Sequence, residues 1–426
     1  MIGKHIYKFA QELWHINRSI TGEGVRETLK RISKHLPTLE IKSVPSGTQV
    51  FDWTVPKEWR VNEAYIITPS GQKICDFSVN NLHLAGYSIP FVGSINLNEL
   101  KEHLYTLSDQ PNAIPYVTSY YKERWGFCLT QEQFDNLENG TYNIIVDTSL
   151  FDGELNYGEL LIKGKNDKEI FLSTYICHPS MANNELSGPT VVTFLAKWLQ
   201  EINETDFSYR IIFIPETIGS ITYLSRNHQD IKKNIYAGFN VSCVGDDRAY
   251  SYLPSRNGKT ISDLIAKHIL KWTDPNFIEY SWLDRGSDER QYCAPGIDLP
   301  IASILGTKYG IYPEYHTSLD NLENVVTPKG LDGGYWVIRK AIEAIEKNKK
   351  YKTTILCEPQ MSKRGLYPTL STKESNEKVE LMMNCISLCD GQTSLLEIAE
   401  YLNLPIWDLY ELVDKLESLS LISENE

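Results

Sequence analysis

Six polar residues, each placed after an apolar stretch, carry the most evident chemistry in this sequence. They are His178, Asn184, Glu216, Asp246 or its neighbour Asp247, and His316. Imidazole and carboxylate groups are the ligands that a catalytic Zn²⁺ ion takes from proteins, with one coordination position left for water. Each residue alone has a simpler explanation, because a Glu at a helix start and an Asp in a turn are favoured without any function. Two histidines and a carboxylate around one point would form a zinc site.

The elements around these residues are predicted to bring them together. Apolar, β-branched runs predict strands at 169–177, 209–215, 236–244 and 300–305, and helical periodicity predicts helices at 188–202, 219–227, 259–272 and 328–347. This alternation predicts a doubly wound α/β fold. Open α/β sheets bind their ligands at the carboxyl ends of the strands, where these polar residues stand. We therefore expect one site along one edge of the sheet.

The rest of the chain divides into segments of different character. Residues 1–45 carry two apolar helical stripes, whereas residues 46–150 consist of short alternating runs rich in Trp and Tyr and interrupted by Pro and Gly. The predicted domains are an α/β domain of residues 1–45 and 151–350, an inserted β domain of residues 46–150, and a C-terminal domain of residues 351–426. The last domain contains a capping box of Ser394 and Glu397 before a helix and resembles a winged helix.

Composition and charge exclude several functional classes. The 426 residues contain no run of about 18 apolar residues that could span a bilayer, and the amino terminus lacks the pattern of a secretory signal. We therefore expect a cytoplasmic protein without a membrane partner. The net charge is −13, and residues 380–426 hold ten acidic residues and one lysine, Lys415, so nucleic acid is not expected as a partner. The eight cysteines form no CxxC pair and are expected to be reduced.

Three arginines and two tyrosines are candidates for shaping a substrate pocket. Arg18, Arg124 and Arg285 lie in polar loops, and a guanidinium is well suited to clamp a substrate carboxylate. Ordinary ion pairs on solvated loops are the alternative for each of them. Tyr312 and Tyr315 lie close to His316, where a phenol could bind the substrate or donate a hydrogen bond to a developing oxyanion. We assign Tyr312 to substrate binding and Tyr315 to catalysis.

The same polar loops carry a family resemblance. The motifs are "HPS" at His178, "NELSG" from Asn184, "ETIGS" from Glu216, "VGDD" from Val244 and "YHTSLD" from Tyr315. Their order resembles that of the α/β zinc aminopeptidases with two co-catalytic metals. Nearly the whole chain resembles more closely a bacterial family of uncharacterised aminopeptidase-like proteins, which carry an inserted β domain and a C-terminal winged helix. Some members are linked to surface polysaccharide synthesis. The resemblance implies a phosphorylase/hydrolase-like core and a general base at Glu216.

Two departures from the two-metal pattern change the expected metal content. The resemblance places a bridging Asp at the position of Asn184 and a ligating Glu at the position of Thr217. A neutral amide cannot offset two dications, and a threonine removes a further carboxylate. We therefore expect one zinc ion per chain, held by His178, Asn184, Asp246 and His316.

The function that follows is a zinc-dependent hydrolase of a peptide or another amide. Glu216 would take a proton from water and return it to the leaving amine. Two alternatives remain: a binding or scaffold protein with a vestigial site, linked to surface polysaccharide synthesis, and transfer or cyclisation chemistry in the same pocket. A homo-oligomer is compatible with the sequence. The substrate is not specified beyond a peptide or small amide.

Overall fold

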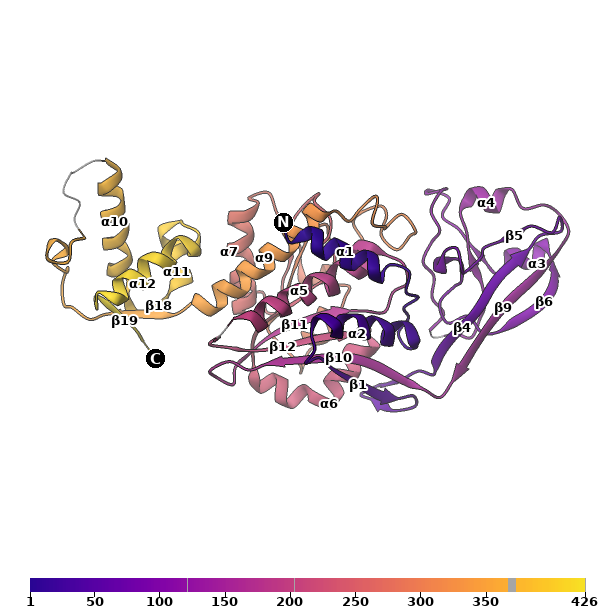
Figure 1. Cartoon of the computed structure of the whole chain (residues 1–426), viewed down its shortest axis with the longest axis horizontal. Coiled ribbons are helices and arrows are strands. Elements are labelled where there is room, and N and C mark those ends of the chain that lie inside the picture. Colours follow the sequence, from indigo (N-terminus) through magenta and orange to yellow (C-terminus); the bar gives the residue numbers. More distant parts are fainter. Residues whose placement is uncertain (121, 203, 367–372, 426) are drawn as a thin grey trace. The chain divides into compact units, whose positions relative to one another are not determined.

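The structure is a computed structural model that describes residues 1–120, 122–202, 204–366 and 373–425, with the side chains of 373–376 left out. It comprises two compact units, shown in Figure 1. The first contains residues 1–263 and 276–336, and the second contains residues 264–275 and 337–426. The β-rich segment of residues 46–150 lies within the first unit.

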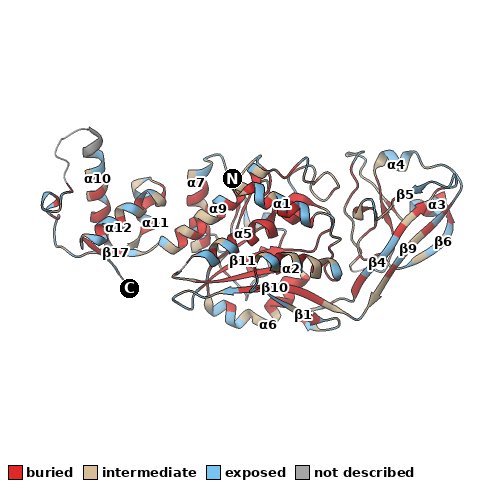
Figure 2. Cartoon of the chain, in the orientation of Figure 1, coloured by how far each residue is buried: buried red, intermediate tan, exposed pale blue. Residues whose placement is uncertain are grey.

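An eight-stranded mixed sheet forms the centre of the first unit, in the order β1-β10-β12-β11-β13-β16-β14-β15. The strands are β1 (Glu40–Pro45), β10 (Glu154–Ile162), β11 (Glu169–Tyr175), β12 (Ser208–Ile214), β13 (Ile235–Asn240), β14 (Ser251–Leu253), β15 (Ile278–Glu279) and β16 (Ile301–Leu305). Strands β12, β11, β13 and β16 are parallel to one another. Strand β10 pairs antiparallel with β1 and β12, and β14 pairs antiparallel with β16 and parallel with β15. Every residue of β11 and β12 is buried, as expected for central parallel strands (Figure 2).

Along the chain, helices alternate with these strands as predicted. They are α1 (Gly3–Leu13), α2 (Glu23–His35), α5 (Ser187–Glu201), α6 (Ile218–Asn234), α7 (Ile261–Thr273), α8 (Glu289–Tyr292) and α9 (Pro328–Lys347), with the short turns η2 (Ala182–Leu186) and η3 (Trp282–Asp284). Helix α5 packs on α1 and β11 through buried residues at helical spacing, including Val191, Leu195 and Leu199. Helix α9 has the predicted bounds, and α6 extends beyond the predicted 219–227.

The β-rich segment forms a four-stranded antiparallel sheet in the order β5-β4-β9-β6 and two smaller pairs. Its elements are β2 (Gln49–Val50), β3 (Trp53–Thr54), β4 (Glu58–Ile67), β5 (Lys73–Ile74), η1 (Asn81–His83), β6 (Phe91–Asn96), α3 (Leu97–Lys101), β7 (Leu104–Tyr105), β8 (Phe127–Cys128), α4 (Gln131–Asp135) and β9 (Thr141–Phe151). One loop of this segment pairs with the loop that carries His316. The Tyr116 N–H donates to the His316 carbonyl at 2.8 Å, and the Ser318 N–H donates to the Ile114 carbonyl at 2.9 Å. The β-rich segment is thus hydrogen-bonded to a predicted site loop.

The second unit contains a three-stranded sheet in the order β18-β17-β19. Its remaining elements are β17 (Lys350–Thr353), η4 (Met361–Arg364), α10 (Lys373–Leu388), β18 (Asp390–Ser394), α11 (Leu395–Leu402), η5 (Ile406–Leu409), α12 (Tyr410–Ser418) and β19 (Ile422–Glu424). The predicted capping box forms between Ser394 and Glu397 at the start of α11. That helix ends at Asn403 in a left-handed conformation. None of the described helices is long and apolar enough to cross a membrane.

Candidate functional site

A hollow of about 550 Å³ opens where the β-rich segment meets the carboxyl ends of the central strands. Three predicted site residues line it from three loops: His178 after β11, Glu216 after β12, and His316 after β16. The other residues of its wall are Ile20, Asp52, Trp53, Thr54, Pro56, Tyr116, Thr118, Tyr120, Cys177, Thr217, Ile218 and Arg290. Its size is that of a site for a small molecule or the end of a peptide.

The His178 ring is held on one side and faces Glu216 on the other. Its Nδ1 lies 3.0 Å from Glu185 Oε2, and its backbone N–H donates to the same oxygen at 3.0 Å. The Nε2 atom lies 3.6 Å from Glu216 Oε2, and the ring centroid is 5.5 Å from that of His316. A carboxylate behind Nδ1 fixes the orientation of the ring and directs Nε2 into the hollow.

Arg18 supports His178 from within the protein. Its Nε donates to the His178 carbonyl at 3.0 Å and lies 3.1 Å from Glu185 Oε1, and the Arg18 and Glu185 side chains are both fully buried. The prediction that Arg18 contacts the substrate is therefore wrong, because its guanidinium lies behind the His178 loop and does not line the hollow. Sequence alone could not distinguish a loop arginine that points inward from one that points into a pocket.

Burial shifts the pKa values of the groups around the hollow. It raises the pKa of Glu216, although the charge of His178 and a hydrogen bond from Ser287 oppose this shift. Burial also lowers the pKa of His316 to about 3. For His178 burial acts downward, but Cys177, Tyr116 and Glu185 act upward and the net shift is upward.

Two of those three neighbours of His178 are neutral near pH 7, because burial raises the pKa of Cys177 to about 11 and that of Tyr116 to about 12. The Glu185 and Glu216 side chains lie on opposite sides of the His178 ring, at 3.0 Å from Nδ1 and 3.6 Å from Nε2.

Tyr116, which the sequence analysis did not select, is a central residue of the hollow. Its ring contacts both histidines edge-on, with centroid distances of 5.4 Å to His178 and 5.1 Å to His316. Its hydroxyl lies 2.9 Å from the Tyr120 hydroxyl. Tyr116 comes from a loop of the β-rich segment without periodic pattern or motif, so no local sequence signal predicts its position.

The two predicted tyrosines occupy other places. Tyr315 stacks on the His316 ring at 3.8 Å and lines a neighbouring hollow of about 620 Å³. The Tyr312 hydroxyl donates to Asp320 Oδ2 at 2.9 Å inside the protein. Neither tyrosine lines the hollow that contains Glu216, so the oxyanion role for Tyr315 and the substrate role for Tyr312 do not match these positions.

Asn184 and Asp246, predicted as metal ligands, do not line the hollow. The Asn184 Oδ1 atom accepts a hydrogen bond from the Tyr175 hydroxyl at 2.9 Å, and its buried Nδ2 has no partner among the described residues. Asp246 accepts four hydrogen bonds, two from Thr307 and one each from Arg248 N–H and Asn183 Nδ2. Its neighbour Asp247 is exposed. The oxygens of Asn184 and Asp246 are thus engaged within the protein.

The other two predicted substrate arginines, Arg124 and Arg285, are likewise away from the hollow. Arg124 donates to the Thr118 carbonyl at 2.9 Å and lies over the Tyr105 ring, and Arg285 is exposed and lies over the Trp282 ring. Arg290, five residues after Arg285, is the arginine that lines the hollow.

Thr217 lies at the base of the hollow in a strained backbone conformation. Its φ is 63° and ψ is −79°, which is unfavourable for a β-branched residue. Its N–H donates to Asp288 Oδ1 at 2.8 Å and its hydroxyl accepts from Arg290 Nη2 at 2.7 Å. Burial and the adjacent Glu216 raise the pKa of Asp288 to about 8.

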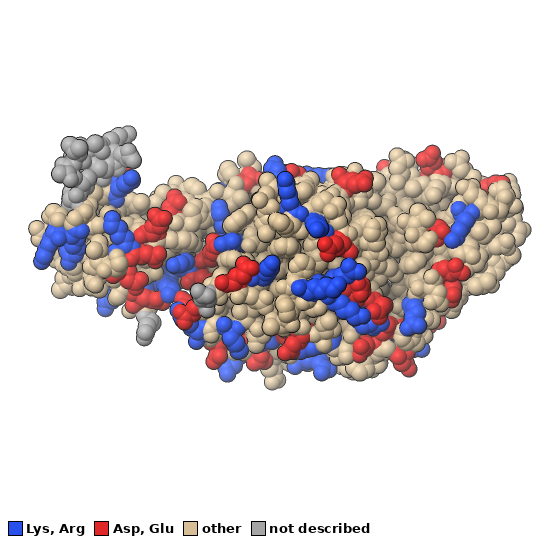
Figure 3. All heavy atoms as spheres, in the orientation of Figure 1, with Lys and Arg blue, Asp and Glu red and all other residues tan. Residues whose placement is uncertain are grey.

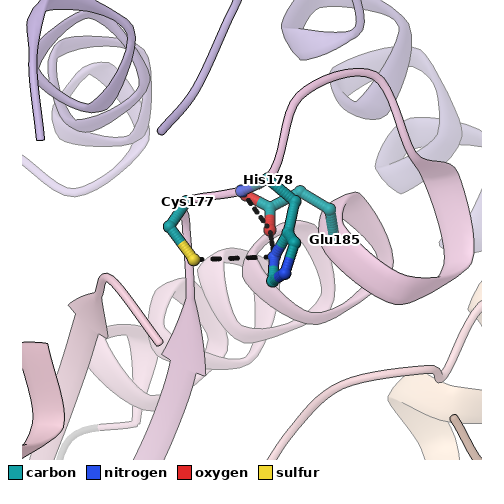
Figure 4. Close-up of side chains that lie close together, drawn as sticks. All are labelled: Cys177, His178 and Glu185. Carbon is teal, nitrogen blue, oxygen red and sulfur yellow. Dashed lines mark hydrogen bonds and ion pairs between the residues drawn. The ribbon is translucent and has the colours of Figure 1, made fainter. Parts of the chain in front are cut away.

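A group of three potential metal donors lies beside the hollow. Among the described residues, Cys177, His178 and Glu185 form the only trio whose donor atoms lie within 4.8 Å of one another (Figure 4). The Glu185 carboxylate in this trio is paired with the Arg18 guanidinium, which opposes a dication there. In the hollow itself, His178 Nε2 and the His316 ring remain as ligands with Glu216 beside them. Besides Glu216, the hollow is lined by one other carboxylate, that of the exposed Asp52.

The fold and the site define an aminopeptidase-like α/β domain followed by a winged helix. A zinc aminopeptidase from Bacillus subtilis superposes with a TM-score of 0.59 at 13% identity, covering 80% of this chain and 95% of that protein. At this identity the similarity shows the shared fold.

Closer relatives establish the family. Residues 7–348 match the family described as a domain of unknown function, DUF4910, and residues 349–424 match a winged helix-turn-helix family. The chain therefore belongs to the DUF4910 family. A Clostridium acetobutylicum protein, provisionally named as a polysaccharide biosynthesis protein with an aminopeptidase-like domain, is 45% identical over 399 residues, which cover 93% of this chain and 91% of that protein.

A crystal structure from the same organism shares the whole architecture. It is provisionally described as a peptidase and superposes with a TM-score of 0.93 at 43% identity, covering 99% of this chain and 96% of that one. These findings confirm the aminopeptidase-like fold with a C-terminal winged helix.

Proposed function

We propose that this protein hydrolyses an amide bond, in a peptide or another small amide, within the hollow that contains His178, Glu216 and His316. The observation that carries this proposal is the convergence of two imidazoles and one partly buried carboxylate from three separate loops. The relationship to a protein described as a peptidase, and the fold shared with a zinc aminopeptidase, support the same class of reaction.

Glu216 is the proposed general base. A carboxylate whose pKa is raised by burial is better matched to proton transfer near neutral pH than an exposed one. It would accept a proton from the attacking water and return it to the leaving amine. The adjacent Tyr116, rather than Tyr315, is placed to donate a hydrogen bond to the substrate in the hollow.

One zinc ion per chain fits the proposal, with His178 Nε2 and His316 as its protein ligands. When bound, zinc supplies Lewis-acid polarisation of the amide carbonyl and activates water. Glu185 holds the His178 ring in the orientation that leaves Nε2 available. Asn184 and Asp246, whose oxygens already accept hydrogen bonds, are not retained as ligands in this proposal.

The experiment that tests the function is Glu216→Gln. Amino-acid anilides, dipeptides and N-acyl amino acids are screened with the wild type in the presence of Zn²⁺, Mn²⁺ or Co²⁺. We expect hydrolysis that falls at least ~10²-fold in the Gln variant, because proton acceptance is lost while shape is kept. Asp52→Asn, which changes an exposed carboxylate of the same hollow, is the matched control and should retain activity. An active substrate whose rate is unchanged in Glu216→Gln would refute the role of Glu216.

A second candidate is a binding or scaffold protein of surface polysaccharide synthesis with an impaired site. It is favoured by the hydrogen-bonded Asn184 and Asp246, which leave the hollow with fewer ligands than a two-metal enzyme needs. The name of the Clostridium acetobutylicum relative points to the same process. Absence of hydrolysis with every metal and substrate would favour this candidate.

We further propose a cytoplasmic protein whose winged helix does not read nucleic acid. The segment from residue 380 onward contains ten acidic residues and Lys415 as its one lysine, so the counterion release that drives DNA binding is lacking. On the face shown in Figure 3, basic and acidic side chains are interspersed. Salt-dependent duplex binding by this unit would contradict the proposal.

A further inference from the structure

Arg290 is a cation in the wall of the hollow that forms no close ion pair among the described residues, although its charge acts on the Glu216 carboxyl group and lowers that group's pKa. In the described part of the chain it makes one hydrogen bond, from Nη2 to Thr217 Oγ1 at 2.7 Å, and no ion pair. Its Nε is buried without a hydrogen-bond partner. The buried arginines of this unit behave differently, since Arg18 pairs with Glu185 and Arg210 pairs with Glu159 and Glu169. Arg124 also has a buried Nε without a partner among the described residues, but it does not line the hollow, whereas Arg290 does.

The surroundings of Arg290 suit a negative group. Helix α6 begins at Ile218 in the same wall, where the side chain of its N-cap residue Thr217 makes no capping bond and Asp288 Oδ1 accepts from the Thr217 N–H and the Ser220 hydroxyl. The first N–H groups of a helix carry partial positive charge and bind anions. The strained Thr217 links the two features, because it precedes α6 and its hydroxyl accepts from Arg290. Two sources of positive potential thus meet at one place in a protein with a net charge of −13.

The wall of the hollow also contains apolar side chains. Ile20, Trp53 and Ile218 line the hollow together with Arg290. A ligand that fits would carry an anionic group next to an apolar portion. We propose that Arg290, together with the start of α6, binds an oxyanion of the substrate, either a carboxylate or a phosphate. For an amide substrate, a carboxylate means an N-acyl amino acid or a short peptide with a free carboxyl end. This inference rests on the proposed function only in taking the same hollow as the substrate site.

Equilibrium binding to the full-length chain tests the inference without any turnover. The protein is first freed of metal by dialysis, and isothermal titration calorimetry then compares N-acetylphenylalanine with its neutral amide. We expect the acid to bind about tenfold more tightly, the usual gain from a hydrogen bond to a charged group. In Arg290→Gln this preference should fall below about twofold. Competition by inorganic phosphate distinguishes a carboxylate site from a phosphate site. If phosphate displaces N-acetylphenylalanine, the site also accepts phosphate.

Arg285→Gln is the matched control, because it removes the same charge from an exposed side chain five residues away. It should keep the preference for the acid. If Arg290→Gln melts well below the wild type, Arg290→Lys keeps the charge without the planar fork and should retain part of the preference.

Three results would overturn the inference: equal binding of acid and amide to the wild type, no binding of either the acid or phosphate, or a preference that survives Arg290→Gln. Binding that depends on Arg290 in a protein without activity would reject the proposed hydrolysis but keep the anion site. Hydrolysis of neutral amides with a KM unaffected by Arg290→Gln would reject the site but keep the hydrolysis.

Discussion

The loops after β11 and β13 both place a potential metal ligand at the carboxyl edge of the sheet, but only the first leaves it available. His178 is fixed through Nδ1 by Glu185, and its Nε2 faces the hollow. Asp246 accepts four hydrogen bonds within its own surroundings and does not line the hollow. The difference shows that residue type and strand position do not define a ligand. A side chain is available as a metal ligand only if its acceptor atoms are not already occupied by hydrogen bonds within the protein.

The largest expected effect on stability comes from Arg18, which holds Glu185 and the His178 loop in place. Arg18→Met removes the guanidinium that pairs with Glu185 and binds the His178 carbonyl, and it leaves a buried carboxylate uncompensated. Breaking such a pair costs about 3–5 kcal/mol of unfolding free energy. Urea denaturation measures this loss, with the exposed Arg285→Gln as a control that should stay within about 0.5 kcal/mol of the wild type. A loss below about 1 kcal/mol for Arg18→Met would mean that the His178 loop does not depend on Arg18.

The second prediction separates the two loops by metal binding. His316→Asn should lose most of the zinc bound by the protein, whereas Asp246→Asn should keep it at no more than about one ion per chain. Asparagine is chosen for His316 because that residue has φ of 56°, which Asn tolerates better than Ala. Asp246→Asn should instead cost about 1–3 kcal/mol of stability, since one amide nitrogen cannot accept from the donors around it.

Elemental analysis and thermal melting distinguish these outcomes. Zinc that disappears in Asp246→Asn but persists in His316→Asn would reverse the assignment of the two loops. Two tightly held ions in the wild type would contradict the single site.

The sequence predicted the regular part of the fold well because its signals are local. Helix α9 has the predicted bounds, and strands β11, β12 and β16 begin or end within two residues of the predicted positions. Strands β1, β10 and β14, which make the antiparallel pairs of this sheet, were not predicted, because such pairing depends on partners distant in the sequence. Helix α10 was also missed. The fold class is confirmed by the relatives and the structure.

The site was predicted in part, and the missing part depends on tertiary contacts. His178, Glu216 and His316 follow strands of one sheet, so topology alone brings them together. Tyr116 reaches them from the β-rich segment through pairing with the His316 loop, which no local pattern reveals. Arg290 lines the hollow and Arg285 does not, because different sides of the short segment that carries both residues face inward and outward. Positions of this kind are set by packing rather than by spacing.

The buried carboxyl group of Asp288 extends the comparison with Asp246, and it gives the smallest expected effect, a change in the pH dependence of stability. Asp288 is buried like Asp246, but only its Oδ1 accepts hydrogen bonds, from Thr217 N–H and the Ser220 hydroxyl, and its Oδ2 has no partner among the described residues. Burial raises its pKa to about 8, whereas an unfolded Asp titrates near 3.9. Below pH ~4 both states hold the proton. Between about pH 4 and 8 the unfolded state releases it first, so this group lowers stability as pH rises through that window, by up to about 1.4 kcal/mol per unit.

Asp288→Asn should remove this dependence while keeping an acceptor for Thr217. The Asn variant should therefore gain stability relative to the wild type as pH rises from 5 to 8, by a total of at least about 1 kcal/mol. Urea denaturation of both proteins at four pH values measures the difference in unfolding free energy. Taking this difference removes the contribution of every other titrating group that the substitution leaves unperturbed. Parallel curves for the two proteins would show that Asp288 is ionised in the folded state, and hence that an unpaired oxygen at this position does not hold a proton.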